Sequence, residues 1–205
     1  MELEEILIQA QKLKFLGKPP VQEHILNAKG FIETIKTLNN NKPEGKLVDL
    51  GSGGGVPSLI LIDWFKDWEV VLIERKEKRA EFLSWATKQL NVEKRTQIIC
   101  DEVENVARNP VFEGKIDIVT ARSFAPPPIT AECACRFLKI RGYLVVSEPP
   151  GNIDRWDNEL LEETGLIPLK SNENKYGTFQ SLELKQKPSD RLPRRPGITR
   201  KRPLW

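Results

Sequence analysis

The sequence predicts a doubly wound α/β fold, with a mostly parallel sheet covered by helices on both faces. Short apolar segments alternate with helical patterns between residues 46 and 184. The first segments, 46–50 and 69–74, are nearly continuous apolar runs, typical of strands buried on both faces. A turn containing four glycines, 51–55, connects the first strand to an apolar helical pattern. Such folds bind ligands at the carboxyl ends of their strands.

Length and composition are those of a globular protein. The chain has 205 residues, of which 39% are hydrophobic and 30% charged, enough for one ordinary domain. We expect a single domain made of N-terminal helices (1–40), an α/β core (46–184) and a basic tail (185–205). No apolar run is long enough to span a bilayer, and the acidic, amphipathic N-terminus is unlike a signal peptide. We therefore expect a cytoplasmic protein.

Two helices should precede the core. Residues 2–16 place apolar side chains at steps of three and four, and Gly17 with Pro19 and Pro20 ends this pattern. A second helix is expected over 20–38. The polar stretch that follows, 39–45, should be a loop.

The rest of the chain alternates between strands and helices. Strands are expected at 46–50, 69–74, 96–100, 115–121, 141–147, 166–170 and 178–184. Helices are expected at 76–90, 126–138 and 153–164. The prolines at the start of 126–138 do not exclude a helix there, because proline is tolerated in a first turn. Residues 171–177 are too few and too polar for a helix, so the last two strands should form a hairpin. This hairpin adds an antiparallel strand to the edge of the sheet.

The three cysteines predict neither a disulfide framework nor a metal site. Their count is odd and low. Cys133 and Cys135 have the wrong spacing for a metal knuckle, and the only histidine, His24, is far away in the sequence. We expect no metal, and buried free thiols at Cys100, Cys133 and Cys135.

Three kinds of nucleotide site compete for the glycine turn. A triphosphate-binding loop would end in Gly-Lys-Ser/Thr, and this turn ends in Val-Pro. The dinucleotide fingerprint requires a sixth-position glycine where this chain has Val56. What remains is an acidic residue, Asp49, followed by glycines at alternate positions. This pattern resembles motif I of class I S-adenosylmethionine-dependent methyltransferases.

The chemistry of the turn suits that cofactor. Gly51 and Gly53 let a ligand lie on bare backbone, and the next helix N-terminus offers N–H groups to a carboxylate. Asp49 could support the turn or meet the cationic methionine end. Glu74, at the end of the second strand, is placed to accept hydrogen bonds from both ribose hydroxyls. Any adenosine cofactor, including NAD, needs such an acid, so Glu74 alone does not discriminate.

Beyond the turn, the chain resembles the RsmG (GidB) family, bacterial enzymes that methylate N7 of a guanine in 16S ribosomal RNA. The matching stretches are "EHILNAKGFIETI", "LVDLGSGGGVPSLILI", "VVLIERKEKRAEFLSWATKQLNV", "DEVENV", "IDIVTARSFAP" and "LPRRPGITRKRPL". They span residues 23–204 in the family's order. The resemblance implies a Rossmann-like class I sheet, S-adenosylmethionine as cofactor, and 16S rRNA or the small ribosomal subunit as partner. We expect a monomer.

The resemblance also implies roles for individual residues. Gly51 and Val56 should contact the cofactor around the turn, and Val103 and Glu104 should lie beside its adenine. Arg122 matches the arginine of the family's "SRA" motif. It could pair with the cofactor carboxylate, a neighbouring acid or an RNA phosphate.

The chain departs from the family pattern at several positions. It begins too late to include the family's longer N-terminal helical segment. Asn27 and Glu102 replace an aspartate and an arginine, and "SEPPG" (147–151) stands where the family has a lysine. We interpret "EPPG" as a loop that lines the cleft, and His24 as a structural residue. These departures concern the RNA target more than the cofactor.

The C-terminal segment 185–205 has eight Lys or Arg and one Asp, a net charge of +7. Because the whole chain carries +3, the first 184 residues carry −4. We expect this tail to fold back near the cofactor and to bind RNA phosphates in a salt-dependent way. The residues expected to do so are Arg191, Arg194, Arg195, Arg200, Lys201 and Arg202.

Methylation of guanine N7 needs no general base, because N7 already has an in-plane lone pair and loses no proton. Positioning for in-line displacement can then supply most of the catalysis. Two other functions stay open: a methyltransferase of the same fold acting on a small molecule or protein, and a non-catalytic RNA- or ribosome-binding protein.

Overall fold

A computed structural model of the chain describes residues 1–149, 151, 155–156 and 159–205. Within these residues it contains an eight-stranded sheet in the order β3-β2-β1-β4-β5-β8-β6, with β7 paired to β8. The strands are β1 (Glu44–Leu50), β2 (Asp67–Ile73), β3 (Thr96–Ile99), β4 (Ile116–Arg122), β5 (Leu138–Glu148), β6 (Leu166–Pro168), β7 (Asn172–Asn174) and β8 (Gly177–Leu184).

The first five strands are parallel and end at the same edge of the sheet. Leu50 at the end of β1 pairs with Ile73 of β2 on one side and with Ala121 of β4 on the other. The strand order reverses direction at β1 and β4, which is where ligands of doubly wound sheets bind. The residues that follow β1, β2 and β4 are therefore brought together by topology.

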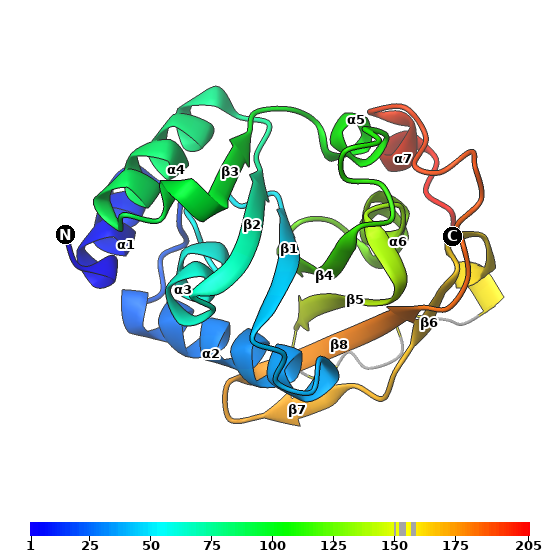
Figure 1. Cartoon of the computed structure of the whole chain (residues 1–205), viewed down its shortest axis with the longest axis horizontal. Coiled ribbons are helices and arrows are strands. Elements are labelled where there is room, and N and C mark those ends of the chain that lie inside the picture. Colours follow the sequence, from blue (N-terminus) through cyan, green and yellow to red (C-terminus); the bar gives the residue numbers. More distant parts are fainter. Residues whose placement is uncertain (150, 152–154, 157–158) are drawn as a thin grey trace.

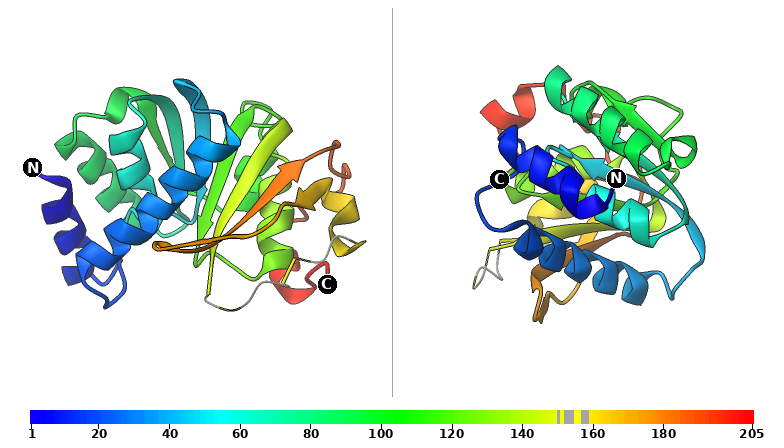
Figure 2. Two further views of the ribbon diagram at one scale, coloured as in Figure 1. Left: turned by 90° about the horizontal axis from the view of Figure 1, so that it is seen from below. Right: turned by 90° about the vertical axis from the view of Figure 1, so that its left-hand side faces the viewer.

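Helices cover both faces of the sheet, as predicted (Figures 1 and 2). Helices α1 to α4 pack on one face of the sheet. The left view of Figure 2 shows α6 and the C-terminal tail on the opposite side. The helices are α1 (Leu3–Lys12), α2 (Val21–Leu38), α3 (Ser58–Trp64), α4 (Glu77–Gln89), α5 (Val103–Ala107), α6 (Pro127–Cys135) and α7 (Ile198–Lys201). None of the described helices is long and apolar enough to cross a membrane.

Each face of the sheet has its own hydrophobic core because successive strand residues point to opposite sides. Leu47 of β1 packs with α1 to α4, whereas Val48 and Leu50 pack with α5, α6 and the tail. Fully buried Phe31 of α2 meets Phe179 of β8 edge-on, with ring centroids 5.0 Å apart. The N-terminal helices are thus packed onto the sheet.

The predicted edge hairpin is confirmed, with two differences in detail. β8 runs antiparallel to β5, and it also pairs antiparallel with β6 and β7. The stretch expected to be only a turn, 171–177, contains the short strand β7. β6 is shorter than expected and ends at Pro168, although the N–H of Leu169 still donates to the carbonyl oxygen of Ser181 in β8 at 2.8 Å.

Three other expectations need correction. The helix expected over 153–164 is a 3₁₀ helix, Glu159–Thr164, and 153–154 and 157–158 lie outside the described residues. The helix expected to reach 138 ends at Cys135, because β5 begins at Leu138. Cys133 and Cys135 are buried as predicted, but Cys100 is exposed because it follows the edge strand β3.

The loop between α1 and α2 packs directly on the glycine turn. A Cβ at Gly54 would lie 2.8 Å from the carbonyl oxygen of Phe15. Only a residue without a side chain allows the two backbones to come this close. The N-terminal helices therefore fix one side of the turn.

Candidate functional site

The glycine turn at the end of β1 has the backbone that the sequence pattern predicted. Gly51, Gly53 and Gly55 have φ values of +66°, +55° and +87°. A Cβ at Gly51 would lie only 2.8 Å from Cδ2 of Phe124. The turn thus needs glycine both for its left-handed conformation and for contact with the segment after β4.

Glu74 links the glycine turn to the end of β2. Its Oε2 accepts a hydrogen bond from the backbone N–H of Gly53 at 3.0 Å, and its Oε1 accepts one from Lys76 at 2.9 Å. The side chain is 4% exposed and lines a cavity of about 200 Å³ at the ends of β1, β2 and β3. Each carboxylate oxygen keeps one lone pair for a ligand donor.

The same cavity contains residues from α5 and from the tail. Val103 and Glu104 line it, and Arg200 of α7 lines it as well. Glu104 is 5% exposed, and its Oε1 accepts a hydrogen bond from the hydroxyl of Thr199 at 2.8 Å. The tail therefore folds back beside the glycine turn, as predicted.

Asp49 supports the turn from beneath. It is 1% exposed, and its Oδ1 accepts a hydrogen bond from the Thr120 hydroxyl at 2.7 Å. Burial raises the pKa of Asp49, against the opposing effect of this hydrogen bond. Of the two roles considered for Asp49, the contacts support the structural one.

Arg122, the last residue of β4, is held by His24 of α2. Its Nη2 lies 2.7 Å from His24 Nδ1, and His24 Nε2 lies 3.2 Å from the carbonyl oxygen of Gly17. Arginine can only donate, so Nδ1 accepts and the ring proton is on Nε2. Burial lowers the pKa of His24 and also that of Arg122, whose charge is favoured by nearby Asp49. His24 is therefore neutral and orients Arg122.

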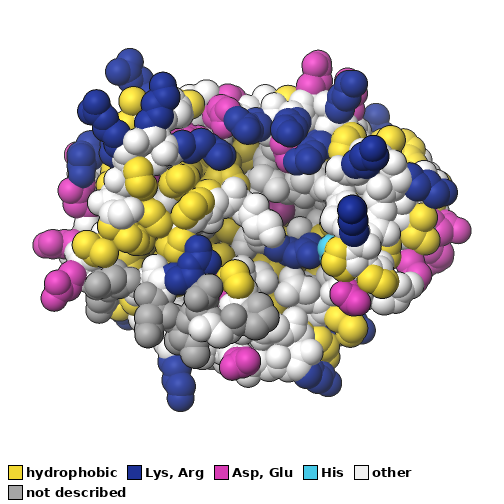
Figure 3. Space-filling view, turned by 180° about the vertical axis from the view of Figure 1, so that it is seen from behind, with side chains coloured by type: hydrophobic (Ala, Val, Ile, Leu, Met, Phe, Trp, Pro, Cys, Tyr) yellow, Lys and Arg dark blue, Asp and Glu magenta, His cyan; other side chains and the backbone are white. Residues whose placement is uncertain are grey.

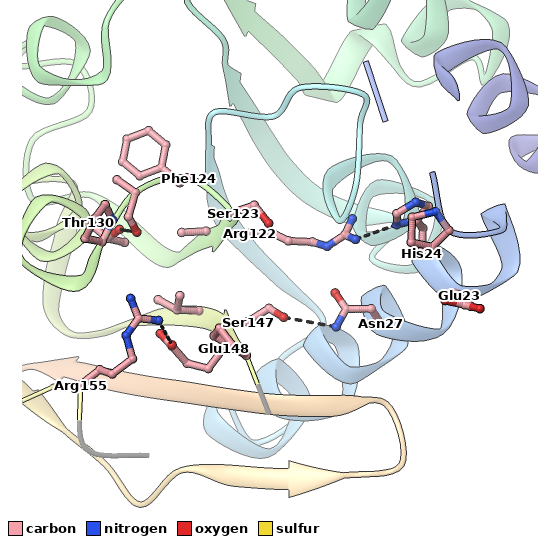
Figure 4. A pocket seen from close by; sticks show the side chains of 16 residues that line it. Glu23, His24, Asn27, Arg122, Ser123, Phe124, Thr130, Ser147, Glu148 and Arg155 are labelled. Carbon is pink, nitrogen blue, oxygen red and sulfur yellow. Dashed lines mark hydrogen bonds and ion pairs between the residues drawn. The ribbon is translucent and has the colours of Figure 1, made fainter. Parts of the chain in front are cut away.

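Arg122 and His24 line a second, larger cavity of about 590 Å³ at the ends of β4 and β5. In Figure 4, Arg122 points toward His24 on one side, and Glu148 lies across the cavity from Phe124. Ser123 and Phe124 line both this cavity and the smaller one. Ser123 has a φ of +52°, an unusual backbone for serine. Ser123 and Phe124 therefore form a wall that the two cavities share.

The tail is anchored by buried polar contacts rather than lying free. Arg194 binds Glu132 of α6, with Nη2 2.6 Å from Oε2, and the Glu132 side chain is fully buried. Arg136 donates to the backbone carbonyls of Leu192 and Asp190. Arg108 donates to the carbonyls of Pro193 and Arg191 in the same way. These contacts hold the tail against α5 and α6.

The tail cations fall into two groups. Arg191 pairs with Glu163, and Arg194 pairs with Glu132. By contrast, Arg195, Lys201 and Arg202 are exposed and form no ion pair within the described part of the chain. On the face shown in Figure 3, Lys and Arg side chains gather along the upper edge.

The structure brings half of the predicted cofactor residues together in one cavity. Gly51, Glu74, Val103 and Glu104 line the smaller cavity, and Arg122 lines the larger one. Three predicted cofactor residues line neither cavity. Of these, Asp49 and Val56 are buried, and Gly53 contributes a backbone N–H to Glu74.

Sequence patterns gave no role to several lining residues. Phe124 lies inside the "ARSFA" stretch without a residue-level signal for its position between the cavities. Glu148 and Pro149 of "EPPG" line the larger cavity, in agreement with part of the interpretation of this segment, whereas residue 150 lies outside the described residues. Glu148 itself ends β5.

Among the described residues, no group of His, Cys, Asp and Glu is arranged to hold a metal ion.

Comparison with known proteins agrees with this arrangement. The family model "GidB: rRNA small subunit methyltransferase G" matches residues 11–154. A protein named ribosomal RNA small subunit methyltransferase G from Thermotoga neapolitana is 30% identical over 189 residues, covering 86% of this chain and 79% of that protein. Its namesake from Dictyoglomus thermophilum is 27% identical over 185 residues, covering 86% of this chain and 76% of that protein.

Solved structures support the fold. A SAM-dependent methyltransferase from Aquifex aeolicus superimposes with a TM-score of 0.59 at 14% identity, covering 86% of this chain and 97% of that one. Sheet order, paired cavities and the match over residues 11–154 lead to one assignment. The chain belongs to the GidB family, rRNA small subunit methyltransferase G.

Proposed function

We propose that this protein transfers a methyl group from S-adenosylmethionine to N7 of a guanine in 16S ribosomal RNA. The observation that carries the proposal is the pair of neighbouring cavities that share Ser123 and Phe124 in their walls. One is bordered by the glycine turn and an acid, and the other is large enough for a nucleotide, within the range of about 300–1,000 Å³ typical of small-ligand sites. Methyl transfer needs two such sites in contact.

The residues of the smaller cavity fit the cofactor. Glu74 has one free lone pair on each carboxylate oxygen, which matches the two hydroxyls of a ribose. Gly51 leaves its backbone bare at the cavity wall. Val103 and Glu104 would lie beside the adenine. When bound, S-adenosylmethionine supplies an electrophilic methyl group on a positively charged sulfur.

His24 is not a candidate general base in the larger cavity. His24, the chain's only histidine, has both ring nitrogens in use, one accepting from Arg122 and the other donating toward Gly17. It is therefore not available to take a proton from a substrate. Guanine N7 needs no deprotonation, so holding the base in line with the methyl group is sufficient.

The exposed tail cations provide a route to the RNA. Arg195, Lys201 and Arg202 are exposed, and Arg200 lies at the smaller cavity. We assign phosphate contact to these four residues and an anchoring role to Arg191 and Arg194. The proposal places the protein in the cytoplasm, as a monomer that acts on 16S rRNA or on the small ribosomal subunit.

Two measurements test the proposal. Isothermal calorimetry should detect S-adenosylmethionine binding, and lack of binding would remove every enzymatic interpretation. Mapping of N7-methylguanosine in 16S rRNA, with and without the gene, should show one modification that disappears with the gene. Cofactor binding with unchanged rRNA methylation would instead favour a small-molecule or protein substrate.

A further inference from the structure

Glu148 is an acidic side chain in the wall of a cavity that, under the proposed function, receives RNA. It is the last residue of β5, is 8% exposed and lines the 590 Å³ cavity. Its Oε1 accepts a hydrogen bond from Trp156 Nε1 at 2.9 Å, and its Oε2 accepts one from Arg155 at 2.5 Å. Two fixed donors therefore hold the carboxylate in place.

These contacts leave part of the carboxylate available to a ligand. A carboxylate has about four acceptor positions, and Trp156 and Arg155 occupy one on each oxygen. One position on each oxygen remains, so Glu148 can accept two further hydrogen bonds from a pair of adjacent N–H donors. Among the four RNA bases, only guanine has two adjacent N–H donors in its ring edge, N1–H and the N2 amine.

The surroundings suit a base in this orientation. Ser123 and Phe124 are in the wall that the smaller and larger cavities share. In Figure 4 they lie across the larger cavity from Glu148. In guanine, N7 lies on the side of the ring system away from N1 and N2. A base with its N1 and N2 donors at Glu148 therefore turns N7 toward the cofactor side. Phe124 is the one Phe, Tyr or Trp among the described lining residues, and offers a surface for stacking.

We propose that Glu148 selects guanine in the larger cavity by accepting hydrogen bonds from N1–H and the N2 amine. This inference rests on the proposed function and adds to it the residue that determines base specificity. Adenine lacks both donors and places an acceptor at N1. Opposite the carboxylate, adenine therefore loses both hydrogen bonds and brings two acceptors together.

Binding of free nucleotides tests this selection without relying on methyl transfer. The full-length protein, saturated with S-adenosylhomocysteine, is titrated with guanosine, inosine and adenosine monophosphates by ligand-observed NMR, which detects millimolar affinity. We expect the order guanosine, inosine, adenosine, because inosine keeps N1–H and lacks the N2 amine. Glu148→Gln should weaken the binding of guanosine monophosphate by about tenfold or more, because hydrogen bonds to a charged acceptor are stronger than those to a neutral one.

A matched variant separates selection from loss of charge or structure. Glu23 lines the same cavity and is exposed, so Glu23→Gln makes the same charge change. The Glu23→Gln protein should bind the three nucleotides in the same order of affinity as the wild type. Equal binding of the three nucleotides to the wild type, or none, would overturn the inference. So would an equal loss for all three in Glu148→Gln, which a merely structural role predicts.

Failure of this inference is distinguishable from failure of the proposed function. If the wild type methylates 16S rRNA but does not discriminate among the nucleotides, only the role of Glu148 is wrong. If it prefers guanosine monophosphate but binds no S-adenosylmethionine, the proposed function is wrong and a guanine site remains.

Discussion

Arg122 donates a hydrogen bond to Nδ1 of His24 over 2.7 Å, which joins the end of β4 to the N-terminal helix α2. Residues 98 positions apart in the chain thus form one contact at the cavity wall. The bond exists only while His24 is neutral, because a protonated imidazole has no acceptor. This dependence leads to a prediction about pH.

Stability should fall on acidification because of His24. Its pKa in the folded protein is lowered from 6.5, mainly by burial and also by the charge of Arg122. The unfolded chain then binds the proton more readily than the folded protein does. The stability that neutral His24 contributes is therefore fully present above pH 6.5 and is lost as pH falls through the lower pKa of the folded protein. Thermal unfolding measured across this range checks the prediction.

His24→Gln provides the control for that measurement. As the chain has a single histidine, the variant should lose the slope just below pH 6.5 while keeping the later loss caused by carboxylates. An identical slope in the two proteins would contradict this role of His24.

Arg194 should be a stability residue. Removing it by Arg194→Ala leaves the fully buried Glu132 without its charged partner. Breaking a buried pair on one side costs about 3–5 kcal/mol. Arg195→Ala removes an exposed neighbour instead and should change the free energy of unfolding by about 0.5 kcal/mol or less. Urea unfolding of both variants makes the comparison, and equal effects would argue against an anchored tail.

Gly51 should be required for more than its backbone conformation. Gly51 and Gly114 both have a φ of +66°, but only at Gly51 would a Cβ meet a neighbour, Phe124 at 2.8 Å. Gly114→Ala should therefore lower the free energy of unfolding only by the cost of placing alanine in a left-handed backbone conformation, about 1–2 kcal/mol. Gly51→Ala should cost more and also weaken S-adenosylmethionine binding in calorimetry. Unchanged cofactor affinity in Gly51→Ala would show that the turn does not hold the cofactor.

The exposed tail cations should set the salt dependence of RNA binding. The triple variant Arg195→Ala, Lys201→Ala and Arg202→Ala should bind 16S rRNA more weakly. The slope of log affinity against log salt should fall by about 2–3, because each phosphate contact contributes about 0.7–0.9. Filter binding at several salt concentrations measures this slope.

A charge-matched control excludes a general effect of net charge. Lys42, Lys88 and Lys94 are exposed and lie toward the amino ends of the strands, away from both cavities. Their triple alanine variant should keep the slope of the wild type. The same loss in both triple variants would indicate non-specific attraction to RNA.

Local sequence patterns were sufficient to predict the fold class, the position of the glycine turn, and most strands and helices of the core in their order, but not α5 or β7. These features are local: buried strands are apolar, helices repeat every three or four residues, and a left-handed turn needs glycine. Gly51 and Glu74 could be placed because the carboxyl ends of parallel strands meet at one edge of the sheet.

Which polar groups face each other depends on how distant segments of the chain pack together. Arg194 and Arg195 are adjacent in the sequence, yet one binds a buried acid and the other is exposed. His24 and Arg122, or Glu104 and Thr199, are joined by hydrogen bonds between distant segments. No local pattern encodes such pairs, because their partners are chosen by packing. For the same reason, the positions of Phe124 and Glu148 around the larger cavity emerged only once β4 and β5 lay side by side.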